Sequence, residues 1–254
     1  MRNVQIVCIL ALLCASGLMP GMAIAQTVVG SACMNVDAGV GDQNVTLTRS
    51  VAVNTWIVVS AATNDAQTHS ASAPVSDTAG NGYPIYDVTQ MQASSGVLAT
   101  FAGRATTALT AGNQVTVHYT DNGLSAMQSC VVVAAFPNVV SLPDPSDGYG
   151  ENSGGGNMLS ATIGLPTQYA SELVYSVFAS AGTPGAINAL APAQGLGEVC
   201  SGDAALCLLP AWSLAAPLAG IYEGADSQSD NSVNWGALVI TFQSNDRIFA
   251  NGFE

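Results

Sequence analysis

Positive charge is the scarcest property of this 254-residue chain, which contains no lysine and only 4 basic residues against 17 acidic ones. Charged residues make up 8% of the sequence, whereas typical globular domains contain about 25%. The surface must therefore consist mainly of small polar and neutral side chains. The formal net charge of −13 repels phosphate backbones and argues against nucleic-acid binding, and it also attracts cations.

Histidine is nearly absent as well, which limits the chemistry that needs a general base. Only His69 and His118 occur, and no G-x-S-x-G nucleophile elbow precedes a helical segment. A triad built from His118, Asp121 and a serine is the remaining route to nucleophilic catalysis, because such triads are defined by geometry. Glycoside hydrolysis would need two carboxylates at a set separation, and no sequence signal places such a pair in a cleft.

No segment shows convincing helical periodicity, whereas short apolar or alternating runs recur between Gly, Asn and Asp turns. The clearest run covers residues 125–136 (SAMQSCVVVAAF), and Pro137 ends it. Its continuous β-branched centre predicts a central strand buried on both faces. Comparable runs cover residues 44–53, 55–61, 96–104, 114–120, 158–163, 172–180 and 233–242. The pattern predicts an all-β protein, a single antiparallel β-sandwich of about a dozen strands.

The N-terminus has the features of a signal peptide. Residues 4–19 are apolar, and an Ala-Ile-Ala sequence ends at Ala25, which predicts cleavage after this residue. We therefore divide the chain into a signal peptide (1–25), a β-sandwich domain (26–243) and a C-terminal tail (244–254). This organisation predicts a secreted, extracellular or cell-surface protein, with the periplasm as another possible compartment, and no membrane span after signal removal.

Cysteine usage agrees with export. Two of the six cysteines fall in the signal peptide, which leaves an even number in the mature chain. Four cysteines allow three pairings. The short turn-forming segment between Cys200 and Cys207 favours a disulfide there, and this pairing leaves Cys33 and Cys130 to join the N-terminus to the central strand.

Several of these segments occur in an order that resembles a group of bacterial extracellular β-sandwich domains. The segments are residues 55–61 (TWIVVSA), 77–83 (DTAGNGY), 114–120 (QVTVHYT) and the valine-rich run at 125–136. The resemblance implies an immunoglobulin-like or jelly-roll sandwich, and it implies no shared catalytic site. Separately, residues 248–254 (IFANGFE) are similar to an IF-x-x-GFE tail of exported bacterial proteins, which implies a role in sorting or processing.

A Pro-, Gly-, Ser- and Asp-rich segment, residues 141–157, is expected to form a long surface loop. Asp144, Asp147, Glu151 and Asn152 supply the hard oxygen ligands that calcium prefers. Two interpretations stay open: these residues bind calcium, or the segment is a plain solvated loop. We expect no other cofactor.

Three tyrosines fall in or near predicted turns, where aromatic rings can be exposed as binding platforms. These are Tyr83, Tyr86 and Tyr149. The three tryptophans fall within predicted strands and are assigned to the core.

Together these features favour a binding or structural module without catalytic activity, either glycan-binding or adhesive. An extracellular carboxylate-dependent hydrolase, similar to a glycosidase, is the alternative. Because natural sheets often protect their edges with lysine, the lack of lysine also raises the prospect of self-association through sheet edges.

Overall fold

The structure is a computed structural model that describes residues 26–36, 41–64, 75–91, 96–119, 127–137, 149–163, 172–182, 185–214, 220–226 and 233–242. The predicted signal peptide, the predicted tail, Asp121, Asp144 and Asp147 lie outside these ranges. The described residues form strands and no helix, which confirms the all-β prediction. Accordingly, they include no helix long and apolar enough to cross a membrane.

The first half of the chain forms two antiparallel sheets. Sheet I, the smaller one, contains in spatial order β2 (Asp42–Thr46), β7 (Gln114–His118) and β4 (Val75–Asp77). Sheet II contains β1 (Thr27–Val36), β8 (Met127–Phe136), β3 (Trp56–Thr63), β6 (Val97–Arg104) and β5 (Ile85–Gln90).

The second half also forms a large and a small sheet. Sheet III contains β13 (Gln194–Gly195), β15 (Leu206–Leu214), β11 (Leu173–Ala181), β17 (Asn234–Phe242) and β9 (Tyr149–Gly155), and β14 (Val199–Cys200) also pairs with β15. Sheet IV contains β10 (Met158–Ile163), β16 (Gly220–Asp226) and β12 (Ile187–Ala189).

The two halves have the same strand order. Sheet II runs β1-β8-β3-β6-β5, and sheet III runs β9-β17-β11-β15 followed by β13 and β14 in the place of β5. Sheet I runs β2-β7-β4, and sheet IV runs β10-β16-β12. Every strand of the first half therefore has a counterpart in the second. In each half the first strand pairs with the last, as in a jelly roll.

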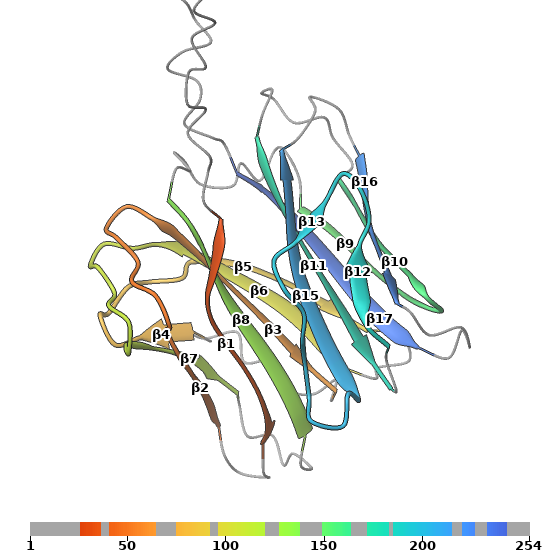
Figure 1. The fold of residues 1–254 in the computed structure, drawn as a ribbon, viewed down its shortest axis with the longest axis horizontal. Helices are drawn as coiled ribbons and strands as arrows, with labels where there is room; N and C mark the ends of the chain where they lie inside the picture. Colours follow the sequence, from red (N-terminus) through yellow and green to blue (C-terminus); the bar gives the residue numbers. More distant parts are fainter. Residues whose placement is uncertain are drawn as a thin grey trace, which may run out of the picture.

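The four sheets stack in the order I, II, III, IV, from left to right in Figure 1. Because side chains alternate along a strand, strands of the two inner sheets contribute to two cores each. In β3, Ile57 faces sheet I whereas Val58 faces sheet III. In β11, Val177 faces sheet II whereas Phe178 faces sheet IV. The structure thus confirms an antiparallel sandwich and adds two layers to it.

This stacking explains the continuous apolar runs in the sequence. The valine-rich segment forms β8, in which only Gln128 is more than slightly exposed. It is the central strand buried on both faces that the sequence predicts. The contact between sheets II and III is mostly apolar, with Phe136 of β8 and Tyr175 of β11 in edge-to-face contact at 5.7 Å between ring centroids.

One buried hydrogen-bonded row crosses this contact between the inner sheets. The Oγ of Ser60 lies 2.7 Å from the hydroxyl of Tyr175 and 3.1 Å from the Oγ1 of Thr100. All three residues are fully buried. Burial raises the pKa of Tyr175, although its hydrogen bond to Ser60 lowers it. The row satisfies polar groups that would otherwise destabilise the core.

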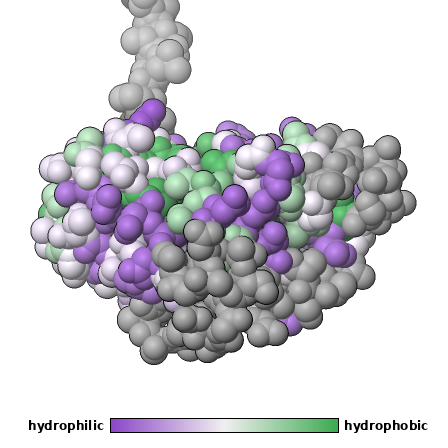
Figure 2. Space-filling model, turned by 90° about the horizontal axis from the view of Figure 1, so that it is seen from below, coloured by the Kyte–Doolittle hydropathy of each residue, from purple (hydrophilic) through white to green (hydrophobic). Residues whose placement is uncertain are grey.

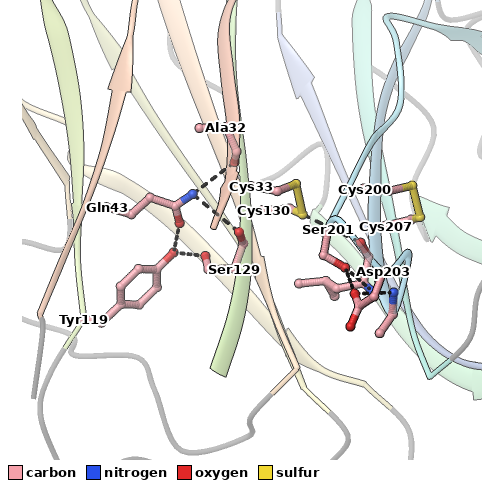
Figure 3. Close-up of a disulfide and its surroundings, with 12 residues drawn as sticks. Ala32, Cys33, Gln43, Tyr119, Ser129, Cys130, Cys200, Ser201, Asp203 and Cys207 are labelled. Atoms are coloured by element: carbon pink, nitrogen blue, oxygen red, sulfur yellow. Dashed lines mark hydrogen bonds between the residues drawn. A yellow bond between two sulfur atoms is a disulfide. The ribbon is translucent and has the colours of Figure 1, made fainter. Parts of the chain in front are cut away.

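Both predicted disulfides are present. Cys33–Cys130 joins directly opposed residues of β1 and β8, and Cys200–Cys207 joins opposed residues of β14 and β15. Figure 3 shows both bonds: Cys33–Cys130 lies at the contact between sheets II and III, and Cys200–Cys207 lies on the side of sheet III that faces sheet IV. The Sγ of Cys130 lies 3.7 Å from the carbonyl oxygen of Leu206 across this contact.

Candidate functional site

The outer face of sheet I is a polar surface. Side chains alternate between the two faces of each strand, and Val45, Val115 and Val117 therefore lie in the core at 0% exposure. The intervening residues therefore project to solvent from three adjacent strands. They are Asp42, Asn44, Thr46, Ser76, Gln114, Thr116 and His118. We call this set the sheet I face.

Hydrogen bonds between strands hold the sheet I face in a fixed arrangement. The Oγ1 of Thr116 donates to the Oδ1 of Asn44 at 2.6 Å. The register aligns Asp42 with His118, and Ser76 with Thr116. Ser76 is thus a diagonal neighbour of His118, a distance that a histidine ring can span.

His118 is the last residue of the middle strand of this face, and it has a polar partner on each side. Its Nδ1 lies 2.7 Å from the Oδ1 of Asp42, and its Nε2 lies 2.8 Å from the Oγ of Ser76. A carboxylate only accepts hydrogen bonds, so Nδ1 carries the proton. Nε2 of the neutral ring is then the acceptor, and the Ser76 hydroxyl donates to it.

The three side chains are accessible to a ligand. The side chains of His118 and Asp42 are 39% and 55% exposed, and Ser76 is also exposed. The sequence predicts His118 as a candidate base in a triad with Asp121, and Asp121 lies outside the described residues. Ser76 and Asp42 were missed because only strand register, and no local pattern, brings residues so far apart in sequence together.

The outer face of sheet IV, the counterpart in the second half, has a different chemistry. Its exposed residues include two large hydrophobic side chains, Met158 at 48% and Ile221 at 57% exposure. They alternate with polar groups such as Thr162 and the half-buried Glu223. Figure 2 views the stack of sheets from below and not onto either outer face, and in this view hydrophilic and near-neutral residues surround smaller hydrophobic areas. Equivalent topology therefore carries two different surfaces.

A second polar site lies where the edge strands of sheets II and III meet. Asp87 of β5 has Thr100 of β6 as its register partner, and it faces Glu151 of β9. Burial raises the pKa of Asp87 to about 6, a hydrogen bond from the Val88 amide partly opposes this, and the negative charge of Glu151 adds to it. The Oδ2 of Asp87 is buried without a hydrogen-bond partner. This aspartate is protonated far more readily than an ordinary one.

The predicted calcium loop takes a different form. The expected loop over residues 141–157 is wrong between Tyr149 and Gly155, because these residues form β9 and pair with β17. Glu151 and Asn152 are neighbours in this strand and point to opposite faces of sheet III. The structure thus separates these two predicted ligands, and calcium binding by the four residues stays a prediction because Asp144 and Asp147 are not described.

One of the three predicted tyrosine platforms, Tyr83, needs correction. Tyr83 is only 9% exposed and packs in the core between sheets I and II, so its ring offers no open platform. Its hydroxyl donates to the Oδ2 of Asp77 at 2.7 Å. Burial and this acceptor raise the pKa of Tyr83. Tyr86 and Tyr149 belong to β5 and β9, and their side chains lie outside the described part of the structure.

The D-x-x-GN-x-Y motif that contains Tyr83 has a structural role. Asp77 accepts hydrogen bonds from the backbone amides of Ala79 and Asn81 and from the Nδ2 of Asn81. The Oδ1 of Asn81 accepts in turn from the backbone amides of Thr106 and Thr107. The motif therefore fixes the turn after β4 to the loop after β6, which positions one edge of the sheet I face.

A shallow hollow of about 380 Å³ lies beside β12 and β15. Glu198 lines it and accepts a hydrogen bond from the Ile187 amide at 2.5 Å. Glu198, Cys200 and Cys207 form the one group of three metal-ligand types found among the described residues. Because the two cysteines form a disulfide, their sulfur atoms are not thiolate ligands.

Comparisons with known proteins do not identify a function for the site. No family model, no curated protein and no solved structure matches the chain. The resemblance to bacterial extracellular sandwich domains, and that of the tail, therefore stay predictions.

Proposed function

We propose that the protein is an exported binding module, and that the sheet I face binds a neutral, hydroxyl-rich ligand such as a glycan. The observation that carries this proposal is the ordered row of amide, hydroxyl, carboxylate and imidazole groups across three strands. Asn44, Thr116 and His118 are held in place by cross-strand hydrogen bonds. Pre-ordered polar groups lose little conformational entropy when a ligand binds.

Export is part of the proposal. Two disulfides support it, because such bonds persist in oxidising compartments and are rare in the cytosol. The net charge of −13 disfavours anionic ligands and thus supports a neutral one. The contrast with sheet IV favours sheet I as the ligand face, since exposed Met158 and Ile221 offer no hydrogen bonds.

A glycan array with purified mature protein, followed by calorimetry with the best ligand, tests the proposal. Asn44→Ala and Thr116→Val each remove hydrogen-bonding groups from the face, and we expect each to weaken binding about tenfold, the loss of one or two hydrogen bonds. Thr162→Ala on β10, the counterpart of β2, is the matched control and should bind normally. Binding that is unaffected by the first two variants, or an array without any ligand, would contradict the proposal.

A carboxylate-dependent hydrolase is the second candidate, and one observation favours it. Burial raises the pKa of Asp87 to about 6, and the charge of Glu151 adds to this effect. Glycosidases use a pair of carboxyl groups, one of which has a raised pKa. A panel of glycoside substrates tests this candidate. Turnover that Asp87→Asn and Glu151→Gln both abolish would support it, and no turnover would remove it.

Self-association through sheet edges is a further proposal, based on the lack of lysine. Light scattering coupled to size exclusion tests it. A mass that rises with concentration is expected, and a constant monomer mass would contradict it.

A further inference from the structure

We propose that Ser76, His118 and Asp42 form a catalytic triad on the sheet I face, with Ser76 as the nucleophile for ester hydrolysis. The substrate class, ester groups on a hydroxyl-rich polymer, rests on the proposed function, because the same face would bind the polymer. The nucleophile itself does not depend on that function, since it is argued from the geometry of the three side chains.

The geometry matches the roles that such chemistry requires. The nucleophilic hydroxyl must donate to one ring nitrogen of the base, and a carboxylate must hold the other. Ser76 Oγ lies 2.8 Å from Nε2 of His118, and Asp42 Oδ1 lies 2.7 Å from Nδ1. The three residues come from three separate strands, β4, β7 and β2, whose register brings them together.

The surroundings of Ser76 also provide a donor for the developing oxyanion. The amide of Thr78 donates to the carbonyl of Gln114. Hydrogen-bonded and non-bonded pairs alternate along an antiparallel ladder, so the amide of Asp77 points away from β7. Since β4 is the outermost strand of sheet I, this amide is directed to the sheet edge. In known hydrolases the residue after the nucleophile supplies such a donor.

The reaction proceeds in two balanced steps. In the first, Ser76 Oγ bonds to the ester carbonyl carbon while its proton passes to His118 Nε2, which then gives the proton to the departing alkoxide. In the second, water attacks the acyl-serine and gives a proton to Nε2. The bond to Oγ breaks, and Nε2 returns the proton to it. The sum is ester plus water giving acid plus alcohol. Asp42 is a positioning residue that holds the ring in the required tautomer.

The open position of the triad fits a large substrate better than a small one. His118, Asp42 and Ser76 lie on an exposed face and not in an enclosed cavity. An extended polymer can lie along such a face, whereas a small ester would make few contacts there. Small activated esters should therefore react slowly, and a covalent probe is the more sensitive readout.

A fluorophosphonate probe, followed by peptide mass spectrometry, tests the nucleophile on the mature, disulfide-bonded protein. We expect one adduct, on Ser76, that is absent in Ser76→Ala and at least about 100-fold slower to form in His118→Ala. Ser153→Ala removes an exposed serine of β9 and should leave labelling unchanged. No adduct, an adduct on another serine, or labelling of Ser76 that persists in His118→Ala would overturn the proposal.

The test of Asp42 must distinguish a role in positioning His118 for catalysis from a role in folding alone. With p-nitrophenyl acetate, we expect the rate to fall at acid pH, and Asp42→Asn to lower it by about 100- to 10,000-fold while Asp42→Glu restores part of it. Equal rates for Asp42→Asn and the parent would overturn the assignment. Two measurements separate the two proposals: labelling of the parent protein, and glycan binding by Ser76→Ala. If the parent is labelled but no glycan binds, only the ligand class is refuted. If the glycan binds but the parent is not labelled, only the triad is refuted.

Discussion

Asp87 gives the sharpest prediction about stability, because it combines a raised pKa with a buried oxygen at the junction of sheets II and III. Burial shifts the pKa of its carboxyl from 3.8 to about 6. The folded state therefore binds a proton more readily than the unfolded chain between these two values. By linkage, the contribution of Asp87 to the free energy of unfolding falls as pH rises through this window, and the loss is complete above pH 6.

The magnitude follows from the pKa difference. A difference of about 2 pKa units corresponds to about 3 kcal/mol. Asp87 keeps some contact with solvent, which screens the charge, so about 1–2 kcal/mol is the better expectation. Asp87→Asn removes the titrating group and keeps an oxygen that accepts from the Val88 amide. The variant should be more stable than the parent by this amount at pH 7.5, and should match it near pH 4.

Urea unfolding of parent and variant at pH 4, 5, 6 and 7.5 measures the difference directly. Comparing the two proteins at each pH cancels the titration of the other carboxylates. Glu151→Gln is the matched variant, because it removes only the repulsion on Asp87 and should give a smaller stabilisation of the same sign. A difference between parent and Asp87→Asn that does not change with pH, or a destabilised variant at pH 7.5, would refute the reasoning.

The remaining predictions concern the covalent and polar connections of the fold. Replacing both Cys33 and Cys130 by serine should lower the free energy of unfolding by about 4.7 kcal/mol, from loop-closure entropy at a separation of 97 residues. Replacing Cys200 and Cys207 instead, at a separation of 7, should cost about 2.4 kcal/mol in the same denaturation assay. The reverse order would show that loop length does not control the effect. Asn81→Ala leaves buried partners unsatisfied and should cost about 2–3 kcal/mol by thermal unfolding, and a loss below 0.5 kcal/mol would contradict its structural role.

Local patterns in the sequence predict the strands and both disulfides. Alternation identifies β7, with Val115 and Val117 facing inward, and unbroken apolar character identifies the doubly buried β8. The disulfides follow from the short turn between Cys200 and Cys207. The strands and the Cys200–Cys207 disulfide can be predicted because each depends on residues close together in the chain. The Cys33–Cys130 disulfide then follows because only these two cysteines remain.

The composition of β9 is typical of a loop, and the segment forms a strand for a physical reason. Its glycines suggest a loop, but they are required by packing. A Cβ on Gly150 would collide with the carbonyl of Thr162, and one on Gly154 would lie 2.5 Å from the ring of Trp235. Glycine therefore allows close approach of β10 and of an aromatic side chain. Such a requirement depends on the neighbours in space and cannot be read from the segment itself.

The long-range register and the matching strand order of the two halves could not be predicted either. His118 meets Asp42 and Ser76 only because β2 and β4 flank β7. The two halves have equivalent strand orders, but the sequence contains no repeat of fixed period. A fold is retained when its side chains change, as long as the inward-facing positions stay apolar. The sheet I face and the outer face of sheet IV show how different side chains occupy the same strand order.

Hydroxyl-radical footprinting with and without the best glycan ligand tests most directly which face binds. His118 on sheet I and Met158 on sheet IV both have oxidisable, exposed side chains, at 39% and 48% exposure, and therefore report on the two faces in one experiment. We expect the ligand to reduce oxidation of His118 and to leave oxidation of Met158 unchanged. Protection of Met158, or a ligand-bound protein in which His118 is oxidised as fast as before, would contradict the assignment of function to sheet I.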